Sequence, residues 1–434
     1  MDRPNIVIIM THDTGRFIGC YGEKIATPNL DRIANEGARF NKYFSSAPVC
    51  GPSRGAMITG KFINRSGTGF QGYGPDFKDP MPQYYAKNGY HTCHFGLYDE
   101  HQKVRVLGYD SVYPDGQDQA PQGAQHRASS IMPAAADYIL NYKNKKPLFL
   151  WIGLYETHRP FKFYEPDRTG ENSSLYNLKD DEKTQEDLSW FRGSVKSLDE
   201  GVGVVLDAIE KSGKTNNTIV VYTTDHGIPF PDCKGTLYDG GTNISLLLRW
   251  KERINPRVCD NFLSNIDLYP TLCELCGFMP PKDIDGKSFA GCLLNGTPTE
   301  REYVFTQITT HCRFRPERAV RSKNYKYIRK FHQTPGGYMP FDVHESLSGK
   351  AIRQEFYARS YTREELYDLE KDPCEKVNVA DCEEYRTIKE KLNLELINFM
   401  VSTKDPLLFG KPILSEHILW KEEKLNNGLP VALW

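Results

Sequence analysis

The sequence predicts an α/β fold: a mostly parallel sheet with helices on both faces, followed by a smaller C-terminal α+β domain with an antiparallel sheet. Continuous apolar runs at 5–10, 147–154 and 218–223 are typical of strands buried on both faces of a parallel sheet. Residues 184–211 carry apolar side chains at helical spacing. Strands that alternate with helices in this way favour a layered α/β domain.

The first helix is expected shortly after the first strand. Thr27 is a suitable N-cap residue, and Pro28 suits the first helical position. The apolar face of this helix is predicted to contain Leu30, Ile33, Ala34 and Ala38. The long helix at 184–211 is predicted to bury Val195, Leu198, Val202, Val205, Leu206 and Ile209.

The pattern changes near residue 300, which divides the chain into predicted domains at 1–300 and 301–434. Residues 303–308 and 319–331 are each predicted to form one strand, and 383–401 a single helix. The last 28 residues contain Pro412 and Pro430 and little periodicity. We expect this tail to wrap the surface or to reach another subunit of a homo-oligomer.

Composition excludes several classes of protein. Fifty-five basic residues against 56 acidic residues give a net charge of -1, which argues against a dedicated nucleic-acid binder. No apolar run approaches the ~18 residues of a membrane span, and the run at 6–10 is too short for a signal-peptide core. With Met1 as the native start the protein is expected to be cytoplasmic, whereas a chain trimmed at this end could be secreted or periplasmic.

Cysteine usage indicates buried, reduced thiols. The 11 cysteines are scattered and lie mostly within apolar patterns. Cys273 and Cys276 form a C-x-x-C motif, but the surrounding sequence is that of an ordinary helix, so a redox or metal role is not expected for this pair.

Two of the apolar runs end in acidic and histidine residues. His12 and Asp13 follow the first run, and Asp225 and His226 follow the run at 218–223. Ligand sites in open α/β sheets lie beyond the carboxyl ends of the strands, so these side chains could together hold a divalent cation. The alternative for each aspartate is that it only caps a turn.

A stronger motif occupies 50–60, with the sequence Cys-Gly-Pro-Ser-Arg-Gly-Ala-Met-Ile-Thr-Gly. Pro52 lies where a helix could begin, which places Cys50 at or beside a helix N-terminus, where unpaired N–H groups favour anions. Arg54 adds a fixed positive charge. A lone cysteine would be interpreted as a buried structural thiol, but the full motif argues against that interpretation.

This motif resembles the sulfatase signature, C-x-P-S-R followed by a small apolar stretch ending in Thr-Gly. Further matches to the family lie at 4–7, 27–31, 224–227, 267–272, 285–288 and 365–373. The resemblance implies the alkaline-phosphatase fold, with a large α/β domain and a small four-stranded C-terminal unit. Segments 155–160, 225–231 and 234–238 are similar to the heparan N-sulfatase (sulfamidase) branch.

The resemblance implies specific roles for the matching residues. Cys50 would be oxidised to formylglycine by a maturation enzyme, and its hydrate would attack sulfur. Asp13, Asp225 and His226 would bind a divalent metal, usually calcium in this family. Arg54 would hold the nucleophile, Lys234 would contact the sulfate, and His158 would protonate the leaving group.

The chain departs from the family pattern at two places. His12 replaces the first of two paired acids; as a neutral metal ligand it would also admit magnesium, manganese or zinc, and otherwise it would orient Asp13. Leu97 and Asp99 occupy the positions of the family's Gly-Lys-x-His lysine and histidine. Asp99 could act as a base, or His101 or His94 could substitute.

The function implied is a sulfatase that removes N- or O-linked sulfate from a sulfated, glycosaminoglycan-derived sugar through a formylglycine-sulfate intermediate. His311 and Arg318 are predicted to contact this anionic saccharide, because the corresponding stretch in sulfamidase-like relatives borders the substrate pocket and arginine matches sulfate and carboxylate geometry. The alternatives are a phosphodiesterase or phosphonate monoester hydrolase on the same fold, and a non-catalytic binder of sulfated glycans.

Overall fold

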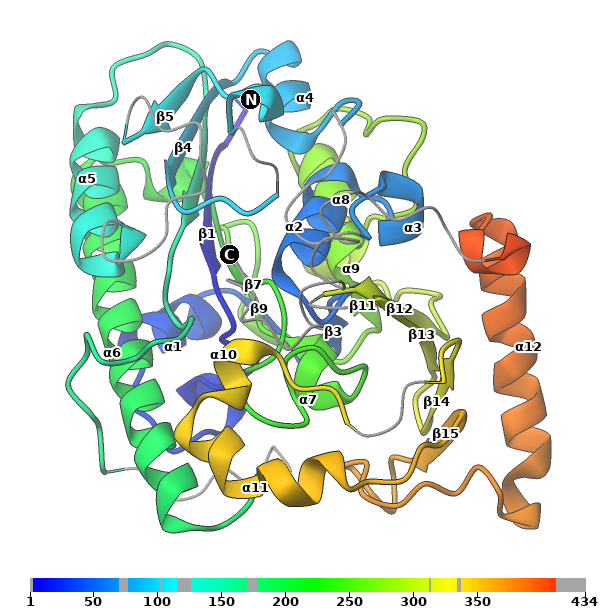
Figure 1. Cartoon of the computed structure of the whole chain (residues 1–434). Helices are drawn as coiled ribbons and strands as arrows, with labels where there is room; N and C mark the ends of the chain where they lie inside the picture. Colours follow the sequence, from blue (N-terminus) through cyan, green and yellow to red (C-terminus); the bar gives the residue numbers. More distant parts are fainter. Residues whose placement is uncertain are drawn as a thin grey trace.

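The structure is a computed structural model that describes residues 3–69, 77–100, 104–114, 126–169, 178–311, 314–333 and 337–410. Its centre is an eight-stranded sheet in the order β10-β2-β9-β7-β1-β6-β4-β5 (Figure 1). The strands are β1 (Asn5–Thr11), β2 (Ala38–Phe40), β4 (His91–Gly96), β5 (Ser111–Tyr113), β6 (Leu148–Gly153), β7 (Thr218–Thr224), β9 (Leu246–Arg249) and β10 (Arg257–Cys259).

The sheet is mostly parallel, as predicted. Strand β1 pairs in parallel with both β6 and β7, so all three predicted central strands are neighbours. Strand β9 runs antiparallel to its neighbours β7 and β2. Every residue of β6 and β7 is buried, which explains why these strands are continuous apolar runs rather than alternating ones.

Helices cover both faces of this sheet (Figure 1). The side chains of β1 alternate between the two layers. Val7 and Ile9 pack with residues of α1 (Pro28–Asn35), α5 (Ala128–Asn141) and α6 (Glu182–Lys211). Ile6, Ile8 and Met10 pack with residues of α2 (Cys50–Thr59), α4 (Met81–Lys87), α8 (Leu268–Leu275) and α9 (Ala290–Asn295). Helix α6 confirms the long helix predicted from the apolar spacing. None of the helices in the described ranges is long and apolar enough to cross a membrane.

The first helix is shorter than predicted. Helix α1 ends at Asn35, and Ala38 lies in β2 instead of on the helix face. Gly37 makes this change of direction possible, because a Cβ atom there would lie 2.3 Å from the carbonyl oxygen of Leu248 in the adjacent strand. Thr27 occupies the N-cap position, but its hydroxyl accepts a hydrogen bond from Gly19 N at 2.9 Å and does not cap the helix.

Shorter elements connect these layers. Cys273 lies within α8 and Cys276 at its C-terminal end, which confirms that the C-x-x-C motif belongs to a helix. A three-stranded sheet consists of β3 (Tyr43–Phe44), β8 (Asn243–Ile244) and β11 (Leu263–Ser264). The short helices include α3 (Ile63–Ser66), α7 (Asp239–Thr242), η1 (Gly19–Tyr21), η2 (Val104–Leu107), η4 (Thr215–Asn217), η5 (Asn265–Asp267), η6 (Glu383–Tyr385) and η7 (Pro406–Phe409).

The C-terminal part forms a four-stranded antiparallel sheet, as predicted. Its strands are β12 (Val304–Thr310), β13 (Phe314–Arg321), β14 (Tyr325–Lys330) and β15 (Glu364–Asp368), and α12 (Arg386–Ser402) packs against them. The prediction of one strand over 319–331 is wrong, because the chain turns between β13 and β14. Ser322 closes this turn by donating its backbone N–H to Tyr325 O at 2.8 Å.

Two helices leave this small sheet and return to the large domain. Helices α10 (Phe341–His344) and α11 (Leu347–Tyr357) lie between β14 and β15 in sequence, yet α11 packs against α6 (Figure 1). Ser348 Oγ donates to Asp187 Oδ2 of α6 at 2.6 Å. The tail that was predicted to wrap the surface lies, from residue 411 onward, outside the described residues.

Arg318 belongs to the interior of this small domain, which corrects its predicted role as a substrate contact. Its side chain is 1% exposed. Its Nε donates to Asp405 Oδ2 at 2.6 Å and its Nη2 to Asp405 Oδ1 at 3.1 Å, while Nη1 donates to the carbonyls of Ile308 and Glu317. Every guanidinium nitrogen thus has a protein acceptor, so Arg318 joins β13 to the segment after α12 and does not face a ligand.

We predict that Arg318→Ala destabilises the protein by about 3–5 kcal/mol, because it leaves the Asp405 carboxylate buried without its partner. Urea unfolding of wild type and variant measures this change. Arg386→Ala is the control, since Arg386 makes only exposed ion pairs with Glu383 and Glu390 and its loss should leave the unfolding midpoint unchanged. Equal midpoints for Arg318→Ala and wild type would contradict a structural role.

Candidate active site

The candidate site begins where β1 and β7 end side by side. Thr11 pairs with Thr224 in the parallel register, so the residues that follow both strands emerge at the same edge of the sheet. Asp13 N donates to Asp225 Oδ1 at 2.9 Å, which shows how closely the two segments approach. The structure therefore brings together the two acid–histidine pairs that the sequence singled out.

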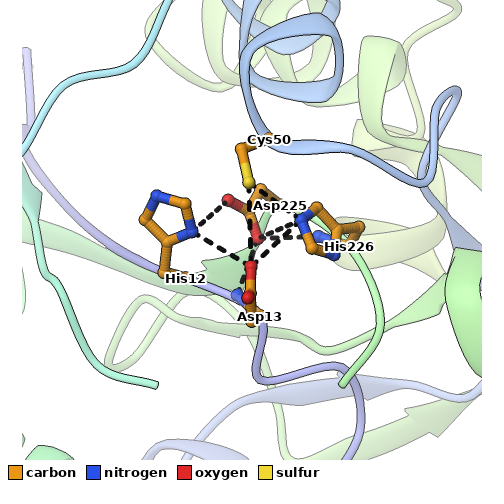
Figure 2. A group of neighbouring side chains, drawn as sticks. All are labelled: His12, Asp13, Cys50, Asp225 and His226. Carbon is orange, nitrogen blue, oxygen red and sulfur yellow. Dashed lines mark hydrogen bonds and ion pairs between the residues drawn. The ribbon is translucent and has the colours of Figure 1, made fainter. Parts of the chain in front are cut away.

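Helix α2 adds Cys50 to this edge of the sheet. Val49 is extended and occupies the N-cap position, so Cys50 is the first residue of the helix, as predicted. Its Sγ lies 3.1 Å from His226 Nε2 and 3.8 Å from Asp13 Oδ1 (Figure 2). Burial raises the pKa of the Cys50 thiol well above its usual value, although Lys234 acts in the opposite direction. The unmodified thiol is consequently a poor nucleophile at neutral pH.

The serine of the signature motif fixes α2 against the strand ends. Ser53 Oγ donates to the carbonyl oxygen of Asp225 at 2.5 Å. Asn265 Nδ2 in turn donates to Ser53 Oγ at 3.0 Å and to Ser53 O at 3.1 Å. Gly55 allows a close approach of Thr68, whose Cγ2 would lie 2.4 Å from a Cβ atom at residue 55. These contacts give the small and polar residues of the motif a positional function. Asn265 carries no recognisable motif and was missed by the sequence analysis.

Five side chains form a compact group that could hold a metal ion. His12, Asp13, Cys50, Asp225 and His226 each offer one ligand atom, and these atoms lie within 4.8 Å of one another (Figure 2). His12 Nδ1 is 3.1 Å from Asp13 Oδ1 and 3.2 Å from Asp225 Oδ2, and His226 Nε2 is 3.0 Å from Asp13 Oδ1. Carboxylates and imidazoles that converge on one point match the donor set of a divalent metal.

The protonation states of His12 and His226 are also compatible with a bound cation. Burial lowers the pKa of His12 to about 4, so its imidazole is neutral at physiological pH. For His226, burial opposes protonation, but Asp225 and Asp13 outweigh it and raise its pKa. His226 Nδ1 lies 3.0 Å from Gly227 O, an arrangement that turns Nε2 toward the carboxylates, as in metal-binding histidines. The negative charges of Asp13 and Asp225 thus stabilise positive charge at the point where a cation would bind.

Lys234 lies between two carboxylates at the rim of this group. Its Nζ is 2.6 Å from Asp13 Oδ2 and 2.9 Å from Asp342 Oδ2. Both acids raise the pKa of Lys234 well above its usual value against the effect of burial, so the ammonium group stays charged. Asp342 comes from α10 of the small domain, which Figure 1 places near the carboxyl end of β1. A single acid in a four-residue helix has no sequence signal, and Asp342 was not predicted.

Arg54 supplies the second fixed positive charge and has one unused donor. Its Nε donates to Asp225 Oδ2 at 3.0 Å, and its Nη2 donates to Thr11 O at 3.1 Å. Its Nη1 has no hydrogen-bond acceptor among the described residues, and the nearest carboxylate oxygen of Glu100 is 3.9 Å away. A buried, unsatisfied N–H group is costly unless a ligand accepts its hydrogen bond.

His158 faces the same acids from the loop after β6. Its Nε2 is 4.0 Å from Asp13 Oδ2 and 3.8 Å from Asp342 Oδ2, and its Nδ1 is 2.6 Å from the carbonyl oxygen of Arg159. That carbonyl assigns the proton to Nδ1 and leaves Nε2 toward the site. Burial, together with Lys234, lowers the pKa of His158.

The loop that carries His158 is anchored by its next residue. Arg159 makes two hydrogen bonds to the carboxylate of Asp187, at 2.7 and 2.8 Å. Asp187 also accepts from the backbone N–H and hydroxyl of Ser348. The His158 loop, α6 and α11 therefore meet at one carboxylate.

Asp99 lies close enough to the site for its carboxyl group to interact electrostatically with Arg54 and Asp225. Burial raises the pKa of Asp99 to about 7, although Arg54 opposes the shift, and the charge of Asp225 adds to it. His94 is instead buried in β4, with its ring against Tyr98 and Tyr109 at centroid distances of 5.9 and 5.1 Å. Leu97 is buried and apolar, and His101 lies outside the described residues.

His311 connects to the site indirectly. Its Nδ1 hydrogen-bonds to the hydroxyl of Tyr338. The Tyr338 ring lies against Gly235, where a Cβ atom would come within 2.8 Å of Cε1. Gly235 follows Lys234 and has a φ of +81°, so a glycine is required both for this backbone conformation and for the contact. His311 thus packs behind the lysine, whereas Arg318 is separate from the group.

Comparison with known proteins identifies the family to which this chain is similar. A family model described as sulfatase matches residues 4–278, and one described as N-sulphoglucosamine sulphohydrolase, C-terminal, matches residues 230–349. An ulvan-active sulfatase of Formosa agariphila is 30% identical, over 95% of this chain and 84% of its own. Human N-acetylgalactosamine-6-sulfatase is 25% identical, over 69% of this chain and 67% of its own.

Solved structures agree in fold. One described as a complex with its substrate D-glucosamine-2-N,6-O-disulfate superposes with a TM-score of 0.74 at 21% identity, over 93% of this chain and 99% of that chain. Another, described as a 2-O GAG sulfatase, has a TM-score of 0.72 at 20% identity, over 96% of both chains. The fold, the signature helix and the matched family models together show that the chain belongs to the sulfatase family of sulfate ester hydrolases.

Proposed function

We propose that this sulfatase removes sulfate from a sulfated sugar of the glycosaminoglycan type, using Cys50 after its conversion to formylglycine and one divalent metal ion. The observation that carries the proposal is the placement of Cys50. Its Sγ points into the His12–Asp13–Asp225–His226 group, so an oxygen in place of the sulfur would face the metal ligands. The relatives named above act on ulvan, N-acetylgalactosamine-6-sulfate and a disulfated glucosamine, which supports an anionic sugar as the substrate.

The conversion of Cys50 is supported by its environment. The raised pKa of the buried thiol makes direct attack on sulfur unfavourable, whereas a hydrated aldehyde supplies a hydroxyl nucleophile. The modification requires a maturation enzyme as a partner during synthesis. Arg54 Nη1, the donor without a protein acceptor, is positioned to hold this hydroxyl or a sulfate oxygen.

A bound divalent metal would neutralise charge on the nucleophile and the sulfate oxygens. Lys234 binds the sulfate group and stabilises the negative charge that develops on it, with its ammonium already oriented by two carboxylates. His158, in its imidazolium form, donates the Nε2 proton to the leaving oxygen or nitrogen, while its Nδ1–H stays hydrogen-bonded to the Arg159 carbonyl. The family resemblance favours calcium, the carboxylate ligands also suit magnesium or manganese, and the imidazole ligands favour zinc.

We predict that Cys50→Ala abolishes turnover of an aryl sulfate without changing the thermal unfolding midpoint. Cys382→Ala, which removes an exposed cysteine, should retain wild-type activity and serves as the matched control. The mass of the Cys50 peptide in the wild-type enzyme distinguishes thiol from aldehyde. Activity of the alanine variant within about tenfold of wild type, or ~1.4 kcal/mol in the barrier, would exclude the proposed nucleophile. Faster turnover of an aryl phosphonate than of an aryl sulfate would instead favour a phosphonate monoester hydrolase.

We expect one divalent ion per chain by elemental analysis, and we expect a chelator to remove both the ion and at least ~99% of the activity, since an ionic contribution of several kcal/mol is lost. Asp225→Asn should lower metal content because it removes an anionic ligand at the centre of the group. Restoring calcium, manganese and zinc in parallel identifies the metal that is used. Full activity in protein shown to be free of metal would refute this part of the proposal.

We predict that Asp342→Asn reduces kcat/KM for an aryl sulfate about tenfold, equivalent to ~1.4 kcal/mol, because Lys234 and His158 lose a charged partner. Lys234 keeps its ion pair with Asp13, so the fold should be unaffected. Asp381→Asn, at an exposed position, is the control. Steady-state kinetics and thermal unfolding of both variants test the prediction, and unchanged kinetics for Asp342→Asn would show that Asp342 is dispensable.

A further inference from the structure

Two cysteines outside the candidate active site lie in direct contact. Cys259 ends β10, which is the outermost strand of the large sheet, and Cys292 lies in α9. Their Sγ atoms are 3.8 Å apart, and both side chains are almost fully buried. Thirty-three positions separate them in the sequence, so the contact joins two distinct elements.

The backbones of the two elements are already held at this spacing. Arg257 Nη1, from the same strand as Cys259, donates to the carbonyl oxygen of Cys292 at 3.0 Å. A disulfide bond has a length of about 2.05 Å. The two sulfur atoms, 3.8 Å apart, therefore have to approach by about 1.8 Å to form this bond.

The two thiols differ in their chemistry. The hydrogen bond with Cys259, aided by the charge of Arg257, lowers the pKa of Cys292 to about 7, although burial acts against this shift. The same hydrogen bond and burial raise the pKa of Cys259. Cys292 is thus the thiol that ionises first, and Cys259 is the adjacent second thiol.

The C-x-x-C motif provides a comparison within the same chain. Burial raises the pKa values of both Cys273 and Cys276. Within the described ranges, no sulfur–sulfur contact involves either of them. The motif that is conspicuous in the sequence therefore lacks the geometry for exchange, and the pair that has this geometry carries no sequence signal.

We propose that Cys259 and Cys292 are a thiol modification site that forms an intramolecular disulfide by exchange with a small disulfide such as oxidised glutathione. The Cys292 thiolate attacks one glutathione sulfur, forms a mixed disulfide and releases one glutathione thiolate. Cys259, after losing its proton, attacks Cys292 Sγ and displaces the second glutathione thiolate. The net reaction converts two cysteine thiols and one glutathione disulfide into one protein disulfide and two glutathione thiols, so electrons and protons balance.

The position of α9 determines how Cys292 becomes accessible and which part of the fold the disulfide would constrain. This helix is only six residues long, and its last two residues and the three after it, 294–298, are exposed, so local opening at its end exposes Cys292. The disulfide would tie the edge strand β10 to α9 and close a loop that contains β11 and η5. Asn265 of η5 is the residue that contacts Ser53 in the signature helix, so the loop adjoins the support of the active site.

The test uses the folded, metal-containing enzyme, incubated with reduced or oxidised glutathione and then alkylated. Digestion with trypsin and chymotrypsin cuts after Arg257 and Phe262 and so separates Cys259 from Cys273 and Cys276. We expect a cross-linked peptide that joins Cys259 to Cys292, and a thermal unfolding midpoint at least ~2 °C higher than that of the reduced protein. Cys259→Ser and Cys292→Ser should each abolish both effects, while Cys273→Ser should retain them.

Three results would overturn the proposal. The first is that glutathione stays attached to Cys292 while Cys259 remains a free thiol. Another is a Cys259–Cys292 peptide that forms only after the protein is unfolded in urea. The third is an unmodified pair after equilibration with excess oxidised glutathione. Peptide mapping of the wild-type enzyme decides among these without relying on the folding of any variant.

Discussion

The approach of two buried carboxylates, Asp13 and Asp225, is the constraint on which the rest of this active site depends. The parallel register of β1 and β7 brings them to the same edge of the sheet, and the backbone N–H of Asp13 donates to Asp225. Like charges at such a distance in a buried site are unfavourable unless cations lie nearby. The positively charged residues around Asp13 and Asp225 offset this negative charge.

That balance comes from separate parts of the fold. Arg54 lies on the signature helix, Lys234 on the loop after β7, and His226, whose pKa is raised, directly after β7. Asp342, contributed by the small domain, adds a further negative charge and orients the lysine. Asp13, Asp225 and Asp342 supply three carboxylates against the two fixed cations Arg54 and Lys234, and this excess of negative charge favours a bound cation.

Sequence reasoning was effective where one physical rule determines position. Parallel strands must place their carboxyl ends at one edge, which is why His12, Asp13, Asp225 and His226 could be grouped correctly. It failed where the partner is distant and has no pattern. Asp405, the partner of Arg318, lies 87 residues away and gives no periodic or motif signal, so a buried structural arginine was mistaken for a ligand contact. The β13–β14 turn was missed because its residues, Ser322, Lys323 and Asn324, include neither glycine nor proline.

The meeting of Arg159, Asp187 and Ser348 has a consequence for how the protein unfolds. Asp187 binds both the loop that carries His158 and helix α11. Helices α10 and α11 lie between two strands of the small sheet, β14 and β15. Asp342, which lies on the same helical segment, forms an ion pair with Lys234 of the site. Loss of the small sheet would therefore remove contacts that hold Lys234 and the His158 loop, so the stability of the candidate site depends on both sheets.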